Sequence, residues 1–108
     1  MYLKIKTKKE LIELVNYIEN SHISWLAIDT EFFRETTYYP ILSLIQISTP
    51  SQTWVIDAIS CVDITPLKLT LENYNIKKIF HAGDQDWGIL KQYTGAKTWP
   101  FTDTQFMA

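Results

Sequence analysis

Two acidic side chains, Asp29 and Glu31, come directly after the apolar run Trp25-Leu26-Ala27-Ile28. A short apolar run with a β-branched residue is typical of a buried strand, and alternate residues of a strand point to the same face. The two carboxylates therefore share a face, where they repel each other and are costly to desolvate unless a cation sits between them. We interpret the pair as half of a metal site. The alternative is that the strand has ended and both acids are solvated.

A second apolar run, residues 76–80, also leads into acids, through His81-Ala82-Gly83 to Asp84-Gln85-Asp86. The residues from Asp84 onward have helical spacing. Asp86 precedes Ile89 and Leu90 by three and four residues, so it lies on the inward-facing side of that helix near its start. Asp84 is a good helix N-cap, which is a sufficient structural account of it.

Together these runs resemble the first two motifs of the DEDD superfamily of 3′–5′ exonucleases, and most closely the ribonuclease D family. The first match covers Leu26 to Phe32 and continues through Arg34, Tyr38-Tyr39-Pro40 and Leu44-Ile45-Gln46; the second covers Lys78 to Asp86. The resemblance reaches Asp103-Thr104-Gln105. It implies a ribonuclease H-like α/β fold and a 3′–5′ exoribonuclease that hydrolyses phosphodiester bonds at single-stranded RNA 3′ ends, as in tRNA processing.

The resemblance also implies a metal site and substrate contacts. Asp29, Glu31 and Asp86 would be the catalytic residues that hold two ions, Mg²⁺ or Mn²⁺. Hard divalent ions prefer carboxylate oxygens, and two of them about 3.5–4 Å apart can activate a water and stabilise a leaving oxygen. Substrate contacts are expected from Phe32, Arg34, Tyr38 and His81. An aromatic ring can stack on any base, although Tyr38 could equally pack in a hairpin and Arg34 could be solvated.

The third motif of the superfamily is not present in the sequence. In the family, that motif carries a fourth aspartate and, four residues before it, a tyrosine that positions the attacking water. No Tyr-x-x-x-Asp occurs after Asp86, and Asp103 matches the Asp-Thr-Gln that the family carries between its second and third motifs. We therefore expect residues 1–108 to form a single partial exonuclease domain, C-terminally truncated, with one sheet face partly bare. A bare apolar face favours a homo-oligomer or a complementing C-terminal polypeptide.

Three functions are compatible with these features. The first is a metal-dependent exonuclease. The second is a catalytically inactive remnant that binds nucleic acid or metal weakly, binds nothing, or needs a partner chain. The third is an interaction module with surface carboxylates, which would require both motifs to have arisen in order by coincidence.

Composition limits the class of protein. The 108 residues suffice for one domain, and 46% hydrophobic with 20% charged residues is ordinary for a globular protein. No segment approaches the roughly 18 apolar residues of a membrane helix, so no membrane partner is expected. The N-terminus lacks a secretory signal, which makes the cytoplasm the default location, and the single Cys61 is expected to be a small buried thiol. With a net charge of −2, nucleic-acid contact must depend on a local site whose cations reverse the local sign.

The surrounding pattern predicts the elements that position the acids. Thr7 and Glu10 have the spacing of a capping box before a helix with the apolar set Leu11, Ile12, Leu14, Val15 and Ile18. The predicted sheet has three antiparallel strands plus one or two parallel ones, flanked by helices. Expected elements are strands at 41–48, 53–57, 76–80 and 101–105, and helices from Thr65-Pro66 and from Asp84. Leu42, Leu44 and Gln46 are expected on one face of their strand, and Tyr74 on the buried side of its helix.

Overall fold

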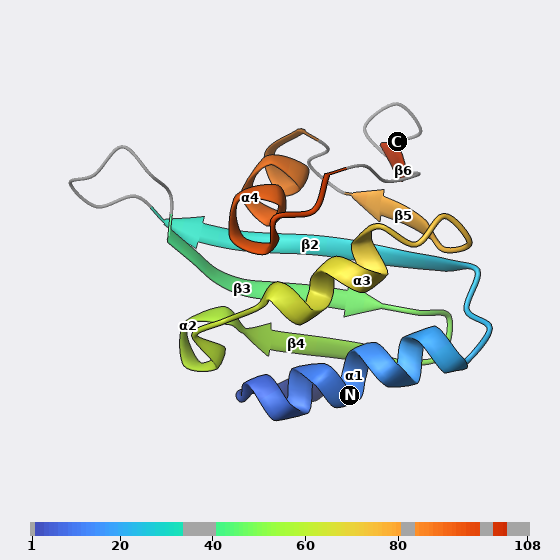
Figure 1. Ribbon diagram of the computed structural model, residues 1–108, viewed down its shortest axis with the longest axis horizontal. Coiled ribbons are helices and arrows are strands. Elements are labelled where there is room, and N and C mark those ends of the chain that lie inside the picture. Colours follow the sequence, from blue (N-terminus) through green and yellow to red (C-terminus); the bar gives the residue numbers. More distant parts are fainter. Residues whose placement is uncertain (1, 34–40, 81–83, 98–100, 104–108) are drawn as a thin grey trace.

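The computed structural model describes residues 2–33, 41–80, 84–97 and 101–103. A six-stranded sheet crosses the molecule in the order β1-β4-β3-β2-β5-β6 (Figure 1). The strands are β1 (Leu3–Ile5), β2 (Trp25–Phe33), β3 (Ile41–Ser48), β4 (Thr53–Asp57), β5 (Lys77–Phe80) and β6 (Phe101–Asp103). The helices are α1 (Lys8–Asn20), α2 (Ala58–Cys61), α3 (Lys68–Leu71) and α4 (Asp84–Thr94), with a 3₁₀ turn η1 (Thr65–Leu67) before α3.

The sheet is mixed, as predicted. β2, β3 and β4 form an antiparallel meander, β5 lies parallel to β2, and β6 lies parallel to β5. A further edge strand, β1, lies parallel to β4. This pairing joins residues about fifty positions apart, so local sequence pattern carries no sign of it.

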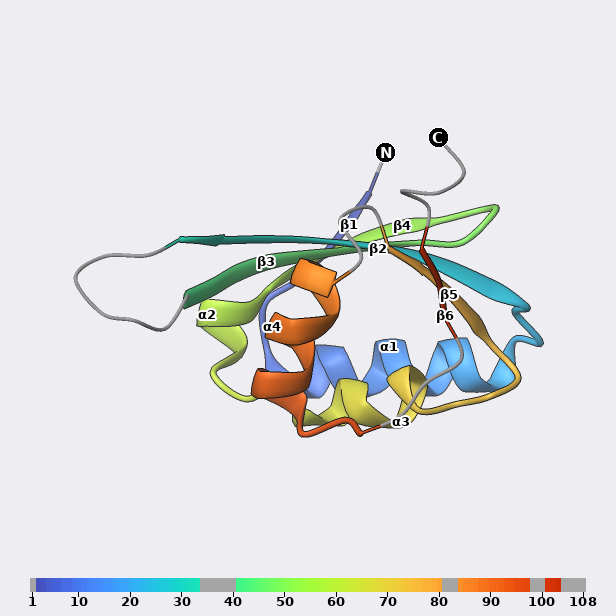
Figure 2. The same cartoon turned by 90° about the horizontal axis from the view of Figure 1, so that it is seen from above.

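All four α-helices lie on one face of the sheet (Figure 2). Most described strand residues that point to this face are almost completely buried, and they form one core with the helices. Among the described residues, no helix covers the opposite face. The buried core includes Leu26, Ile28, Ile45, Ile47, Ile56 and Phe80 from the sheet, and Leu11, Ile18, Leu67, Leu71 and Leu90 from the helical layer.

Helix α1 begins with the predicted capping box. The Glu10 amide donates to Thr7 Oγ1 over 3.1 Å, and the Thr7 amide donates to the Glu10 carboxylate over 3.1 Å. Backbone hydrogen bonds from Lys6 and Thr7 lower the pKa of Glu10. The predicted apolar set is buried except for Ile12, which is 42% exposed because it lies one position round the helix from Leu11 and off the buried stripe.

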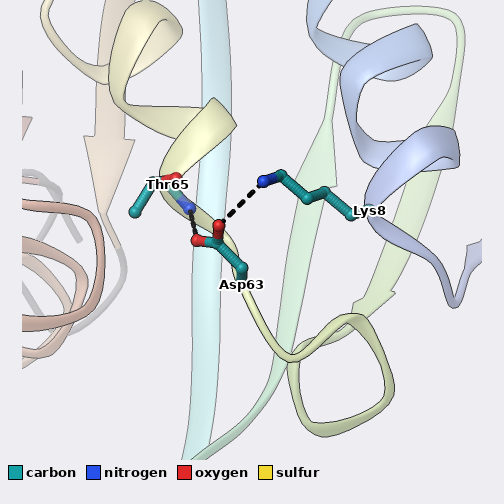
Figure 3. Close-up of polar contacts among 3 residues, drawn as sticks. All are labelled: Lys8, Asp63 and Thr65. Carbon is teal, nitrogen blue, oxygen red and sulfur yellow. Dashed lines mark hydrogen bonds and ion pairs between the residues drawn. The ribbon is translucent and has the colours of Figure 1, made fainter.

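Polar side-chain contacts join the start of α1 to the loop before η1. Asp63 Oδ1 accepts from the Thr65 amide over 3.0 Å, and Asp63 Oδ2 lies 3.0 Å from Lys8 Nζ (Figure 3). The hydrogen bond from the Thr65 amide, followed by the interaction with Lys8, lowers the pKa of Asp63 to about 2. Asp63 therefore satisfies the open amide of Thr65, the first residue of η1.

The second predicted helix is shorter than expected. Leu67 and Leu71 are buried, but α3 ends at Leu71, so Tyr74 lies beyond it and is 72% exposed, contrary to the prediction that it lies on the buried side. A separate short helix, α2, was not predicted. Asp57 caps it by accepting a hydrogen bond from the Ser60 amide over 3.0 Å.

A buried polar cluster joins α1, the segment after α3, and β5. Lys78 has no exposed surface, and its Nζ donates to the carbonyl of Asn73. Glu19 accepts from Thr70 Oγ1 over 3.0 Å and from Asn73 Nδ2 over 2.7 Å. Burial lowers the pKa of Lys78 to about 8, against a smaller opposing effect of the Glu19 carboxylate.

Cys61 is buried as predicted, and burial raises the pKa of its thiol. In the parts of the chain that the structure describes, there is no helix with the length and apolar character needed to span a membrane.

Candidate functional site

The two acids of the first motif lie within β2. The sequence pattern placed the end of the strand at these carboxylates, but β2 continues to Phe33 because β3 pairs with it over the whole segment. Asp29 and Glu31 are both exposed on the face away from the helices. On its other side, β2 pairs with β5 only as far as Ile28, which lies opposite Phe80. The acids therefore lie just beyond the carboxyl end of β5, where sites form in open α/β sheets.

Asp29 and Glu31 line the same hollow of about 280 Å³ on the open face of the sheet. Asp29 pairs across the sheet with Gln46, and Glu31 pairs with Leu44. This arrangement confirms the prediction that both carboxylates share a face. The remaining residues around the hollow are Tyr2, Leu44, Gln46, Thr53 and Val55.

A β-bulge at Ser43 lies next to Glu31. Glu31 pairs with Leu44 whereas Phe32 pairs with Leu42, so Ser43 is an extra residue in β3. The prediction that Leu42 shares a face with Leu44 and Gln46 is therefore wrong, because Leu42 turns into the core and is 1% exposed. Ser43 Oγ donates to the Glu31 carbonyl over 2.9 Å. Bulges re-aim side chains next to functional sites, and this one leaves Leu44 in the hollow while Leu42 packs beneath it.

Asp86 approaches β2 from the helical side. It lies in the first turn of α4 and is 2% exposed, which confirms the predicted inward direction. Thr30 Oγ1 donates to Asp86 Oδ1 over 2.6 Å. Thr30 stands between Asp29 and Glu31 in sequence and points to the opposite face of the strand. The third acid is therefore joined to the same strand segment as the other two, through the residue between them.

The donor chemistry of the hollow fits a hard divalent cation, because two exposed carboxylates from one strand face the same space. The third carboxylate is not part of a ready cluster: within the described residues, no group of three His, Cys, Asp or Glu side chains is arranged to hold a metal ion. Asp29 and Glu31 are thus brought together, whereas Asp86 lies against Thr30.

The predicted substrate contacts are only partly within the described residues. Phe32 is partly buried and packs against the core, on the strand face opposite to the two acids. Arg34, Tyr38 and His81 lie outside the described residues. Thr30, Tyr2 and Thr53 were not singled out from the sequence. Thr30 could have been found from its position: it lies between two acids that share one face of the strand, so its own side chain must point to the other face.

The chain belongs to the 3′–5′ exonuclease family, because the model of that family matches residues 2–108. It is similar to ribonuclease D of Zymomonas mobilis, with 44% identity over 90 residues, and to ribonuclease D of Escherichia coli, with 40% identity over 83 residues. These alignments cover 82% and 77% of the chain but 23% and 22% of the relatives. The chain therefore spans about a quarter of the length of these curated relatives. The predicted resemblance to ribonuclease D is confirmed.

Solved structures show the same fold. The crystal structure of Escherichia coli RNase D, described as an exoribonuclease involved in structured RNA processing, matches with a TM-score of 0.88 and 34% identity. The match covers 99% of the chain and 28% of that structure's chain. Trypanosoma brucei RNase D in complex with RNA U12 matches with a TM-score of 0.80 at 22% identity, which shows the fold alone.

Proposed function

We propose that the chain forms part of a ribonuclease D-like exonuclease domain that removes nucleotides from RNA 3′ ends. The observation that carries this proposal is that Asp29 and Glu31, the two acids that resemble the family's first motif, open onto one hollow on the bare face of the sheet. The Escherichia coli relative is described as acting on structured RNA. By that similarity, we propose that the substrate class is single-stranded 3′ ends of structured RNA, such as tRNA precursors.

The proposed metal ligands are Asp29, Glu31 and Asp86. When bound at such carboxylates, two Mg²⁺ or Mn²⁺ ions supply an activated water and stabilise charge on the leaving oxygen. Asp29 and Glu31 provide oxygen donors from the open face, and Asp86 provides one from the first turn of α4. Phe32, Arg34, Tyr38 and His81 are proposed to contact the substrate; Phe32 is partly buried, so only the exposed part of its ring is available for this.

The proposal is tested with the purified chain and a 5′-labelled single-stranded RNA. With Mn²⁺ present, we expect a ladder of products shortened from the 3′ end. Asp29→Asn removes one charge from the hollow at nearly constant size and is expected to abolish shortening. Glu13→Gln, an equivalent change on the exposed side of α1, is the matched control and is expected to leave it intact. Equal shortening by wild type and Asp29→Asn would contradict the proposal.

A second candidate is a remnant that binds metal or nucleic acid without cleaving, or that needs a second copy or a complementing polypeptide. One observation favours it: within the described residues, no group of three acidic side chains is arranged to hold a metal ion. This function predicts no shortening of the RNA. It predicts instead that Mn²⁺ raises the melting temperature of the wild type and that Asp29→Asn removes this stabilisation.

A further inference from the structure

Thr30 occupies the middle position of the first motif but belongs to the other side of the sheet. Its neighbours Asp29 and Glu31 are exposed in the hollow, whereas Thr30 points toward the helical layer. There it lies two residues beyond Ile28, the last β2 residue that pairs with β5. Helix α4 begins four residues after β5 ends, so its first turn fills the space beside β2 where the fifth strand no longer runs.

The contact made in that space is a short hydrogen bond to a buried acid. Thr30 Oγ1 and Asp86 Oδ1 are 2.6 Å apart, within the range of an O–H donor on an ionised carboxylate. Asp86 is 2% exposed, and a carboxylate taken out of water must be hydrogen-bonded. The hydroxyl holds one oxygen of the carboxyl group, and this restricts the direction in which the other oxygen can point.

We propose that Thr30 is a positioning residue that orients the Asp86 carboxylate toward the cation site formed by Asp29 and Glu31. This inference rests on the proposed function. Ligating carboxylates are themselves held by hydrogen bonds, and loss of such a partner typically lowers metal affinity 10–100-fold. Because Thr30 is covalently joined to both Asp29 and Glu31, its hydroxyl couples the α4 acid to the two strand acids within a single tripeptide.

The test uses Thr30→Val, which keeps the branched shape and removes the hydroxyl, and Thr30→Ser, which keeps the hydroxyl. Mn²⁺ is titrated into each ¹³C-labelled protein. Electron paramagnetic resonance measures free Mn²⁺, and carbon-detected NMR follows paramagnetic broadening of the side-chain carboxyl signals. In the wild type, we expect Asp29, Glu31 and Asp86 to broaden at the same low Mn²⁺ concentration. In Thr30→Val, affinity should fall 10–100-fold and Asp86 should broaden later than the strand acids; Thr30→Ser should restore both.

The possible results separate the two proposals. If Asp29 and Glu31 do not broaden in the wild type, the proposed function fails and the positioning role fails with it. If those two broaden but Asp86 behaves alike in wild type and Thr30→Val, or Thr30→Ser does not restore it, only the positioning role is overturned. Thr30→Ala is a second hydroxyl-free variant in case Thr30→Val does not fold. If neither folds while Thr30→Ser does, the hydroxyl is required for the fold itself and the positioning role is also overturned.

Discussion

Replacing Lys78 with methionine tests whether the buried charge in β5 reduces stability. The folded protein lowers the pKa of Lys78 from 10.5 to about 8 because the side chain is buried, so the chain binds this proton less tightly when folded. At about 1.4 kcal/mol per pKa unit, the protonated lysine costs on the order of 3 kcal/mol of the free energy of unfolding. Methionine has a similar length and removes this cost. It also removes the hydrogen bond to the Asn73 carbonyl, worth about 1 kcal/mol.

The expected difference depends on pH. Below pH 8, both folded and unfolded wild type hold the proton, and Lys78→Met should be more stable by about 2 kcal/mol. Between pH 8 and 10.5 the unfolded chain binds more protons than the folded chain, so wild-type stability gains from rising pH. The advantage of Lys78→Met should therefore disappear by pH 10.5. There the lost hydrogen bond should leave the variant less stable by about 1 kcal/mol.

Urea unfolding followed by tryptophan fluorescence at several pH values measures this difference. Lys77→Met is the matched control, because Lys77 is the exposed neighbour on the same strand and its removal should not change the pH dependence. Stability curves of wild type and Lys78→Met that run parallel from pH 8 to 10.5 would refute the reasoning.

Four further substitutions test how the helices and loops are stabilised. Thr7→Ala removes the side-chain half of the capping box and should lower the free energy of unfolding by about 1 kcal/mol in urea; an unchanged midpoint would contradict the cap. Asp63→Ala should lower the melting temperature above pH 4. The difference in melting temperature between wild type and variant should narrow as pH falls toward 2, because the folded state keeps this carboxylate ionised to about pH 2. A difference that stays constant over this pH range would contradict the prediction. Gly95→Ala should lower the free energy of unfolding by about 1 kcal/mol because Gly95 has a φ of +77°, whereas Gly88→Ala within α4 should raise it by about 0.5–1 kcal/mol. Neither added methyl group meets an atom within 4 Å, so packing should not differ between the two sites. Effects of the same sign in urea unfolding would contradict the argument from backbone conformation.

The features predicted correctly from sequence depend on residues close together in the chain. The capping box at Thr7 and Glu10 and the helical spacing around Asp86 each involve a few neighbouring positions, and both are present in the structure. The strand bounds Ile41–Ser48 and Thr53–Asp57 were also predicted as observed, since turn residues separate them from their neighbours.

The features that were not predicted depend on distant parts of the chain. The bulge at Ser43 results from pairing with β2, and no residue type in β3 marks it. The parallel pairing of β1 with β4 joins segments separated by the whole of α1, β2 and β3. The hydrogen bond between Thr30 and Asp86 spans 56 positions, so no local pattern in the sequence marks the hydroxyl that contacts this acid.

We propose that Asp29 and Glu31 hold a divalent cation on the open face of the sheet, and locating the ion tests this most directly. Crystals of the chain grown with Mn²⁺ and measured near the manganese absorption edge would locate the ion directly. We expect an anomalous peak within bonding distance of both carboxylates, about 2.0–2.3 Å from an oxygen of each. A map with no peak beside these two side chains, at a Mn²⁺ concentration that supports shortening of RNA, would contradict the claim.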